Sequence, residues 1–386
     1  MSFAMSSHPY FEHNPGGIML YGYRLRDIEI AQQSFWAQLV ALNIAHYVQI
    51  QVHGKQGDRY SVGFRLADAY AGVWAAGCDT MQLCQQLALH TQDDSADLER
   101  EIVLAMLLAP VAFEFPGHAE LAAAIRIRTN IVTAGRKTAM AFDTVEAERP
   151  LEYWTYSEAS GFVIRPGKNL IEALQKATQP ASSGELYSFS CYRATEYVIL
   201  LAIAEEIVTT NPALFQQLQQ QWQNQAIMSG QFHEVFLSEY GAMDAPLPPK
   251  YYVPGDRLWF RNPDAFSSDV MGYEGSWVLY LGGGLFTNFW KRDAPYTLTS
   301  KCVELYHWRN ATYRDPAGVL QIDEAVVEAC VAVTLLDPLE TARILEQMLR
   351  FRDPHGVYVD GGCIDTTREY PRWVCPGTAN ITLPRL

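Results

Sequence analysis

Apolar residues recur at every third or fourth position over residues 25–53 and again over residues 65–90. This spacing places them on one face of a helix, so we predict two amphipathic helices joined by a turn at residues 54–58. A polar run follows, and Asp97 at its end is a suitable N-cap for the next helix. Residues 1–96 are therefore predicted to form an N-terminal helical addition.

The centre of the chain alternates between helical and strand patterns. Helical spacing covers residues 118–141 and 169–178. Between them, residues 153–157 and 161–165 alternate apolar with polar side chains around a short turn, which predicts a hairpin. Residues 191–206 are almost continuously apolar at helical spacing, and this pattern predicts a long apolar helix.

Strand-like runs dominate the chain after this helix. Residues 256–261, 276–281 and 285–290 are rich in aromatic and β-branched side chains, and three glycines join the last two runs. This pattern predicts an antiparallel sheet with hairpin connections. Two further helices are predicted beyond the sheet, over residues 323–336 and 338–351.

The predicted fold class is α+β, with most helices placed before and after the sheet. We divide the chain into the N-terminal addition, a core over residues 97–310, and a C-terminal helical extension and loop over residues 311–386. Residues 361–376, rich in glycine, proline and threonine, are predicted to be loop.

The composition is that of a globular protein, with 49% apolar and 19% charged residues. The net charge of −14, without any cluster of Lys and Arg, argues against nucleic acid as a partner. The amino terminus lacks the basic start and apolar core of a signal peptide, and no apolar run reaches the length of a membrane span. We therefore expect a cytoplasmic protein without a membrane partner, with export by a route without a cleaved signal left open.

The cysteine pattern argues against a metal site or a disulfide scaffold. The seven cysteines are widely spread and contain no CxxC pair. Cys363 and Cys375 could bridge only in an oxidising setting.

Cys191 is the candidate nucleophile because it stands where a strand-like aromatic approach becomes the long apolar helix. Ser188 or Ser190 can cap this helix by accepting hydrogen bonds from its free backbone N–H groups. A thiol in the first turn faces the positive end of the helix dipole, which favours the thiolate, and Arg193 adds to this effect. The alternative is a buried structural thiol, a common environment for free cysteine.

The middle of the chain resembles the bacillus-type protein-glutamine γ-glutamyltransferases, the spore-coat transglutaminases. The resemblance covers roughly residues 98–310, and its segments occur in the family's order. These are residues 109–115, 125–134, 153–154, 187–191, 254–263, 274–282 and 285–288. Each segment is weak alone, but the conserved order of all seven is fairly specific.

The resemblance implies a papain-like core and places the family's catalytic cysteine on Cys191. Enzymes of this kind attack a glutamine carboxamide of a protein substrate through the thiolate, release ammonia, and pass the acyl group to a lysine amine or to water. The products are isopeptide cross-links or deamidated proteins. The resemblance implies no metal and no cofactor.

Two positions depart from the family pattern. Ser276 stands where the family has a glutamate, directly after the glycine that matches Gly275, and Asn288 stands where the family has a histidine in the next strand. Asparagine can orient a group but cannot take a proton at neutral pH. Glu274 lies two residues before Ser276, on the same face of a regular strand, and a small shift of register would let it replace the missing glutamate.

Three hypotheses account for these departures. Glu274 is the base for Cys191, or His233 or His307 reaches the thiol from a flanking segment. In the third, the fold has lost its chemistry and serves as a transglutaminase-like binding or structural module. We take the active acyltransferase as the main hypothesis and the inactive module as the alternative.

Overall fold

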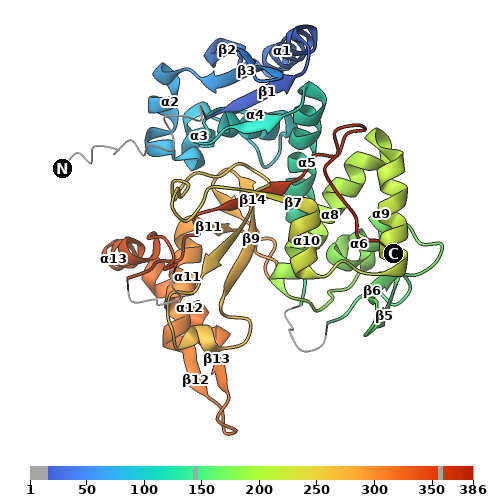
Figure 1. Ribbon diagram of the computed structural model, residues 1–386. Coiled ribbons are helices and arrows are strands. Elements are labelled where there is room, and N and C mark those ends of the chain that lie inside the picture. The colour runs from blue at the N-terminus through green and yellow to red at the C-terminus, as the bar shows by residue number, and fades with distance from the viewer. Residues whose placement is uncertain (1–15, 142–146, 355–359, 386) are drawn as a thin grey trace.

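The strand-like runs of the second half form the larger sheet of the computed structural model, which describes residues 16–141, 147–354 and 360–385 (Figure 1). Its order is β11-β10-β9-β8-β14-β7, and all of its paired neighbours are antiparallel. The strands are β7 (Leu237–Tyr240), β8 (Arg257–Arg261), β9 (Gly275–Gly282), β10 (Leu285–Phe286), β11 (Tyr296–Thr297) and β14 (Arg368–Pro371). Helices make up 46% and strands 18% of the described residues, which agrees with a mixed helix-and-sheet class.

Strand β9 separates two parts of the core because successive side chains of a strand point to opposite faces. Leu279 and the partly buried Trp277 pack in the cluster that contains α8 (Cys191–Thr210). Val278 and Tyr280 pack in a different cluster, together with residues of α11 (Leu298–Ala311). One face of β9 is thus covered by α8 and the other by α11.

Helix α8 is buried on nearly all sides, as its continuous apolar sequence requires. It contacts β9 and is surrounded by α5, α6, α9 and α10 (Figure 1). Its helical neighbours are α5 (His118–Lys137), α6 (Leu170–Thr178), α9 (Pro212–Asn224) and α10 (Ser229–Phe236), and the β5 (Trp154–Ser157) and β6 (Gly161–Ile164) hairpin lies nearby with the short α7 (Pro180–Ser183). The helices predicted near residues 118, 169 and 191 and the predicted hairpin are confirmed.

The N-terminal region contains a four-stranded sheet, so the prediction of a purely helical addition is wrong, although α1 (Leu25–Ala41) confirms the first part of the helix predicted over residues 25–53. Its order is β2-β3-β1-β4, and β2 and β3 form a hairpin that replaces the end of the first predicted helix and turns within the predicted turn at residues 54–58. Val62, Phe64 and Leu66 are buried at every second position, which is strand spacing. The elements are β1 (Ile18–Gly22), α1 (Leu25–Ala41), β2 (Val48–Gln56), β3 (Arg59–Leu66), α2 (Asp68–Trp74), α3 (Leu83–Leu87), α4 (Ser95–Leu107) and β4 (Phe113–Phe115).

The predicted cap at Asp97 is also wrong. The cap of α4 is Asp94, whose carboxylate accepts hydrogen bonds from the backbone N–H groups of Ala96 and Asp97. Asp97 lies inside the helix, and its carboxylate accepts a hydrogen bond from the backbone N–H of His90 at 2.8 Å. The parallel pairing of β1 with β4 joins the N-terminal sheet to residues beyond the predicted boundary at residues 96 and 97.

The C-terminal part contributes to the larger sheet as well as adding helices. Helices α12 (Glu324–Leu335) and α13 (Pro338–Met348) are confirmed, and the hairpin of β12 (Thr312–Arg314) and β13 (Leu320–Ile322) precedes them. Residues 361–376, predicted to be loop, contain β14, which lies between β8 and β7. A four-residue strand flanked by loop gives too short an alternating pattern to be recognised in the sequence.

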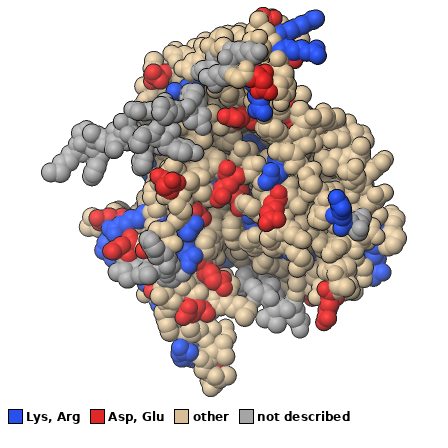
Figure 2. Space-filling view, viewed as in Figure 1, with Lys and Arg blue, Asp and Glu red and all other residues tan. Residues whose placement is uncertain are grey.

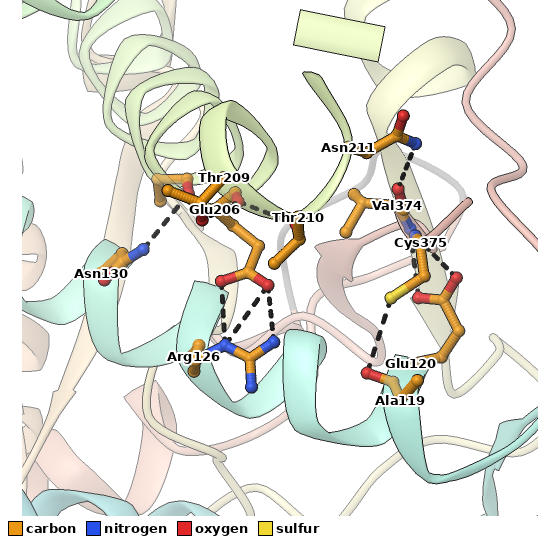
Figure 3. A network of polar contacts seen from close by, with 11 residues as sticks. Ala119, Glu120, Arg126, Asn130, Glu206, Thr209, Thr210, Asn211, Val374 and Cys375 are labelled. Atoms are coloured by element: carbon orange, nitrogen blue, oxygen red, sulfur yellow. Dashed lines mark hydrogen bonds and ion pairs between the residues drawn. The ribbon is translucent and has the colours of Figure 1, made fainter. Parts of the chain in front are cut away.

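The segment after β14 is held against α5 and the end of α8 by polar contacts (Figure 3). The Glu120 carboxylate accepts hydrogen bonds from the backbone N–H groups of Val374 and Cys375 at 3.1 and 2.8 Å. Asn211 donates to the carbonyl of Val374 at 2.8 Å. These contacts keep the C-terminal end of the chain in place on the helices that surround α8.

The seven cysteines are free, and Cys363 and Cys375 do not pair with each other. Cys363 Sγ lies 3.6 Å from Cys302 Sγ on α11, and both residues are fully buried. Cys375 Sγ instead lies 3.5 Å from the carbonyl oxygen of Ala119. Sequence spacing alone could not identify these neighbours because the residues of each contact lie far apart in the chain.

The charges are distributed without a continuous basic surface on the face drawn in Figure 2, where Lys and Arg form small separate groups among the described residues. This distribution agrees with the net charge of −14. Across the described residues, none of the helices combines the length and the apolar character needed to span a membrane.

A buried ion pair fixes α5 to the segment that leads into β8. Arg128 Nη1 lies 2.8 Å from Asp256 Oδ1, and both side chains are almost fully buried. The other carboxylate oxygen of Asp256 accepts hydrogen bonds from the hydroxyl of Tyr240 and, at 2.8 Å, from the backbone N–H of Val253. The backbone approaches so closely that a Cβ on Gly255 (φ +89°) would lie 3.0 Å from Arg128 Cα.

We expect Asp256→Asn to lower the free energy of unfolding by about 3–5 kcal/mol, because it leaves the Arg128 guanidinium buried without a counter-charge. Chemical denaturation of the full-length protein measures this loss. Asp58→Asn is the matched control, since Asp58 is exposed and 4.0 Å from Arg59, and its effect should stay below about 1 kcal/mol. Equal losses in the two variants would contradict the role given to the buried pair.

Candidate active site

Cys191 is the first residue of α8, as the sequence predicts, and Ser190 is the cap. Ser190 Oγ accepts a hydrogen bond from the backbone N–H of Arg193 at 3.3 Å. Phe189 before the cap is 1% exposed, and Cys191 itself is 9% exposed. The apolar approach therefore anchors the start of the helix in the core and holds the thiol just below the surface.

Opposing influences act on the Cys191 thiol. Burial raises its pKa. Hydrogen bonds from the backbone of Trp277 and Tyr192 and the positive charges of Lys301 and Arg257 act in the opposite direction, because each stabilises the thiolate. The thiol is thus a weak acid in the free protein, set among donors and cations that favour its ionised form.

A small cavity of about 210 Å³ opens beside Cys191. The indoles of Trp259 and Trp277 stack above one another in its wall, with ring centroids 5.9 Å apart and an angle of 12° between the rings. Gly275 is required here, because a Cβ would lie 2.3 Å from Trp259 Nε1. The residues that line this cavity, named the thiol cavity below, are Ser190, Cys191, Tyr192, Trp259, Gly272, Glu274, Gly275 and Trp277.

Glu274 lines the thiol cavity together with Cys191. The shift of strand register that we predicted would bring Glu274 to this position does not occur. Glu274 precedes β9, and β9 pairs with β8 in unbroken register from Gly275 to Leu279. Its exposed side chain lies at a bend, where Oε1 is 3.4 Å from the backbone N–H of Gly272. Because of this bend, Glu274 and Ser276 do not share one face of a regular strand.

Ser276 and Asn288 line a second, larger cavity of about 550 Å³. Ser276 is 2% exposed, and among the described residues its Oγ has no hydrogen-bond partner. The larger cavity and the thiol cavity share Gly272 and Gly275 in their linings. Of the four residues predicted from the sequence, Cys191 and Glu274 thus line the thiol cavity, whereas Ser276 and Asn288 line the larger cavity. The backbone at Gly272 and Gly275 borders both cavities.

Asn288 does not lie in a strand, which corrects the prediction for residues 285–290. Strand β10 ends at Phe286, and Asn288 belongs to the following turn. Its Nδ2 donates to the carbonyl of Ala294 at 3.0 Å, and its Oδ1 accepts from the backbone N–H of Lys291 at 3.1 Å. Asn288 therefore stabilises a turn with both ends of its amide.

The two histidine candidates are bound elsewhere. His233 Nδ1 lies 2.8 Å from Glu369, whose carboxylate also pairs with the buried Arg257. His307 lies on α11, where Nε2 is 2.7 Å from Thr334 Oγ1. Neither histidine is among the residues that line the thiol cavity.

Sequence reasoning missed α11 and with it Lys301. Lys301 is fully buried, with Nζ 3.2 Å from Glu304 Oε1 and 4.1 Å from the ring centroid of Tyr296. Thr297 and Ser300 form a capping box at the start of α11. This Thr-x-x-Ser pair was the signal that could have located the helix, although Ser is not the usual third residue of such a box.

Arg257 is the second missed residue, and it belongs to a strand that the sequence did predict. Its Nε donates to Thr195 Oγ1 at 2.8 Å, and its guanidinium carbon lies 3.9 Å from the centroid of the Trp277 ring. A charged residue in a strand pattern carries no sign of burial, so only the packing of α8 against β9 identifies its role.

We expect Lys301→Met to raise the pKa of Cys191 further, because it removes a positive charge that favours the thiolate. The midpoint pH of Cys191 alkylation by iodoacetamide, followed by mass spectrometry, should therefore move upward. Lys291→Met is the matched control, since Lys291 is 57% exposed and pairs with Glu328. An unchanged midpoint in Lys301→Met would contradict the electrostatic role of Lys301.

Comparison with known proteins agrees with the resemblance found in the sequence. A family model described as protein-glutamine gamma-glutamyltransferase matches residues 78–381. The match extends beyond residues 98–310 in both directions and takes in α11, α12 and β14. A comparison with curated proteins gave no match. Since the matched stretch is well over half of the 386 residues, the chain belongs to the bacillus-type protein-glutamine gamma-glutamyltransferase family.

Proposed function

We propose that the protein is a cysteine acyltransferase that attacks glutamine carboxamides of protein substrates through Cys191. The observation that carries the proposal is the position of the thiol at the start of α8, beside backbone donors from Trp277 and Tyr192 and next to a cavity. A substrate carbonyl that enters this cavity meets the helix start, where partial positive charge stabilises a developing oxyanion. Family membership, with its protein substrates that contain glutamine, supports this proposal.

The reaction we propose proceeds in two acyl transfers. Cys191 Sγ forms a bond with the carboxamide carbon, the C–N bond breaks, and the thiol proton leaves with the nitrogen as ammonia. A lysine amine then forms a bond with the thioester carbon, the C–S bond breaks, and a proton of the amine returns to Sγ. Water in place of the amine gives deamidation.

Glu274 is the group we propose to move these protons. Glu274 lines the thiol cavity, and its side chain is exposed to solvent. A carboxylate there can accept the thiol proton and deliver it to the departing nitrogen. The histidine position of the family is Asn288, whose amide is engaged in a turn.

The core is proposed to be papain-like, with α8 and the β8–β9 pair as its central elements. In such a core the nucleophile starts a helix that packs on an antiparallel sheet, and α8 contacts β9 in this way. We also propose residues 97 and 310 as the limits of this core. Strand pairing crosses both limits, because β1 pairs with β4 and β14 pairs with β7.

We expect Cys191→Ala to abolish both ammonia release and incorporation of a fluorescent amine into a panel of glutamine-containing proteins, a loss of at least about a thousandfold. The loss follows because no thioester forms without Sγ. Cys330→Ala, at a partly exposed thiol of α12, is the control and should keep wild-type rates. Equal rates in wild type and Cys191→Ala would refute the proposed function.

We expect Glu274→Gln to lower kcat/KM about 100-fold or more while leaving the fold intact, because glutamine keeps the size of the side chain but cannot carry a proton. The rate of ammonia release measures this effect. Glu158→Gln, in an exposed turn, serves as the control. Wild-type kinetics in Glu274→Gln would exclude Glu274 as the proton carrier.

A non-catalytic binding module is the second candidate function. It is favoured by Ser276 and Asn288, which replace two proton-transfer residues of the family pattern, and by the raised pKa of the buried Cys191 thiol. The amine-incorporation assay distinguishes the acyltransferase from the binding module. Absence of turnover over the whole panel, together with a Cys191 that resists alkylation near neutral pH, would favour the binding module.

A further inference from the structure

Helix α12 is apolar around most of its circumference, although most of the helix is exposed. Its 12 residues include only two charged side chains, Glu324 and Glu328, and only Val327 and Thr334 are buried. A helix that is apolar on all sides is normally buried on all sides. The exposed side of α12 therefore indicates a surface that another molecule covers.

The exposed apolar residues of α12 form one continuous stripe. Val326, Ala329, Val333 and Leu336 follow one another at intervals of three, four and three residues, which places them on the same side of the helix. Leu339, in the first turn of α13, extends the stripe. Val333, Leu336 and Leu339 are 70%, 86% and 84% exposed. These five residues are named the outer face below.

The outer face is separate from the contacts that α12 already makes. Helices α12 and α13 pack on α11, on the side of the larger sheet opposite α8 (Figure 1). Val327 belongs to the core cluster that contains residues of α11. None of the five residues of the outer face lines the larger cavity or the thiol cavity. The outer face is thus a third surface of α12, and a contiguous apolar surface of this kind is typical of a protein interaction site.

The spacing of the outer face suits packing against another helix. Apolar residues at alternating intervals of three and four form the seam by which two helices pack side by side. The distance between two packed helix axes is about 8–10 Å and depends on the side chains at the contact. Ala329 in the stripe and Ala325 beside it are small, so a second helix can approach α12 closely. The partner segment that fits is an amphipathic helix.

The charges of the chain around the outer face are all negative. Residues 315–342 contain no Lys, Arg or His, and their acidic residues are Asp315, Asp323, Glu324, Glu328, Asp337 and Glu340. Lys291 pairs with Glu328, and Arg343 pairs with Glu340. Asp323 and Asp337 are exposed at the two ends of α12, where their carboxylates cap α12 and α13. An apolar surface with a carboxylate at each end is complementary to an apolar segment with basic ends.

We propose that the outer face binds a basic amphipathic helix of a protein partner. The apolar side of that helix packs on the stripe, and its Lys or Arg residues lie near Asp323 and Asp337. These aspartates are 14 residues apart, which corresponds to about 21 Å along a helix axis. The partner therefore has basic groups at about this separation. This binding goes beyond the proposed function and does not depend on it.

The same charges argue against two other occupants. In a symmetric pairing of α12 with a second copy of this chain, each end of the outer face meets an aspartate of the other copy, and like charges repel. A membrane surface that contains anionic lipids repels the carboxylates as well. A basic helix is the occupant whose charge matches that of the outer face.

Fluorescence anisotropy on the full-length Cys191→Ala protein tests the proposal without turnover of the probe. The probes are two fluorescein-labelled helical peptides of about 18 residues, long enough to span α12. Both have leucines at intervals of three and four on one side. One has lysines near both ends, and the other has glutamates at the same positions. We expect the lysine peptide to bind at least about tenfold more tightly than the glutamate peptide.

Variants in the Cys191→Ala background locate the binding. Combined Val333→Gln and Leu336→Gln should weaken binding of the lysine peptide at least about tenfold, because it removes exposed apolar contacts without adding charge. Val52→Gln is the matched control, since Val52 is 75% exposed on β2, and it should have no effect. Combined Asp323→Asn and Asp337→Asn keeps both helix caps and should reduce the preference for the lysine peptide to about threefold or less.

The proposal is overturned if the two peptides bind equally, or if the lysine peptide does not bind at its highest soluble concentration. It also fails if the Val333 and Leu336 variant binds the lysine peptide as well as Val52→Gln does. Sedimentation velocity and vesicles that contain phosphatidylserine test the other occupants. Self-association or vesicle binding that disappears in the Val333 and Leu336 variant would assign the outer face to a second copy or to a membrane, and would overturn the proposal.

Discussion

The alternation of side chains along β9 is the constraint on which the site depends. A strand cannot present consecutive residues to the same partner, so β9 gives Trp277 and Leu279 to the α8 side and Val278 and Tyr280 to the α11 side. The backbone of Trp277 reaches Cys191, whereas Ser276 lines the cavity bordered by α11 and α12. The two cavities follow directly from this division, with Gly272 and Gly275 between them.

The electrostatics of the thiol depend on charges that are fixed by the fold. Lys301 is buried on α11, and Arg257 is held in β8 by Thr195 and Glu369. Charges fixed in this way need no reorganisation when the thiolate forms. They also belong to the interactions that stabilise the core, so the same contacts support both the fold and the reactivity of Cys191.

Local patterns in the sequence predicted most of the elements around the thiol. The helices that became α5, α6 and α8, the β5–β6 hairpin and strands β8 and β9 each have a clear period or a clear cap. The strands that were not predicted share one cause. Their patterns of apolar and polar residues are too short, or too mixed in period, to assign from the local sequence. The β2–β3 hairpin lies in a segment with both periods, and β14 is only four residues long.

The sequence by itself determined the family, the position of Cys191 at a helix start and the departures at Ser276 and Asn288, because each depends on residue type and order along the chain. Only the tertiary structure decided which groups surround the thiol. The charges of Lys301 and Arg257 act on Cys191 from segments more than sixty residues away, and Glu274 lines the same cavity from a bend that precedes β9. The packing of elements that are distant in sequence brings these residues close to Cys191. The periodic pattern of apolar residues within one element contains no information about which other elements pack against it.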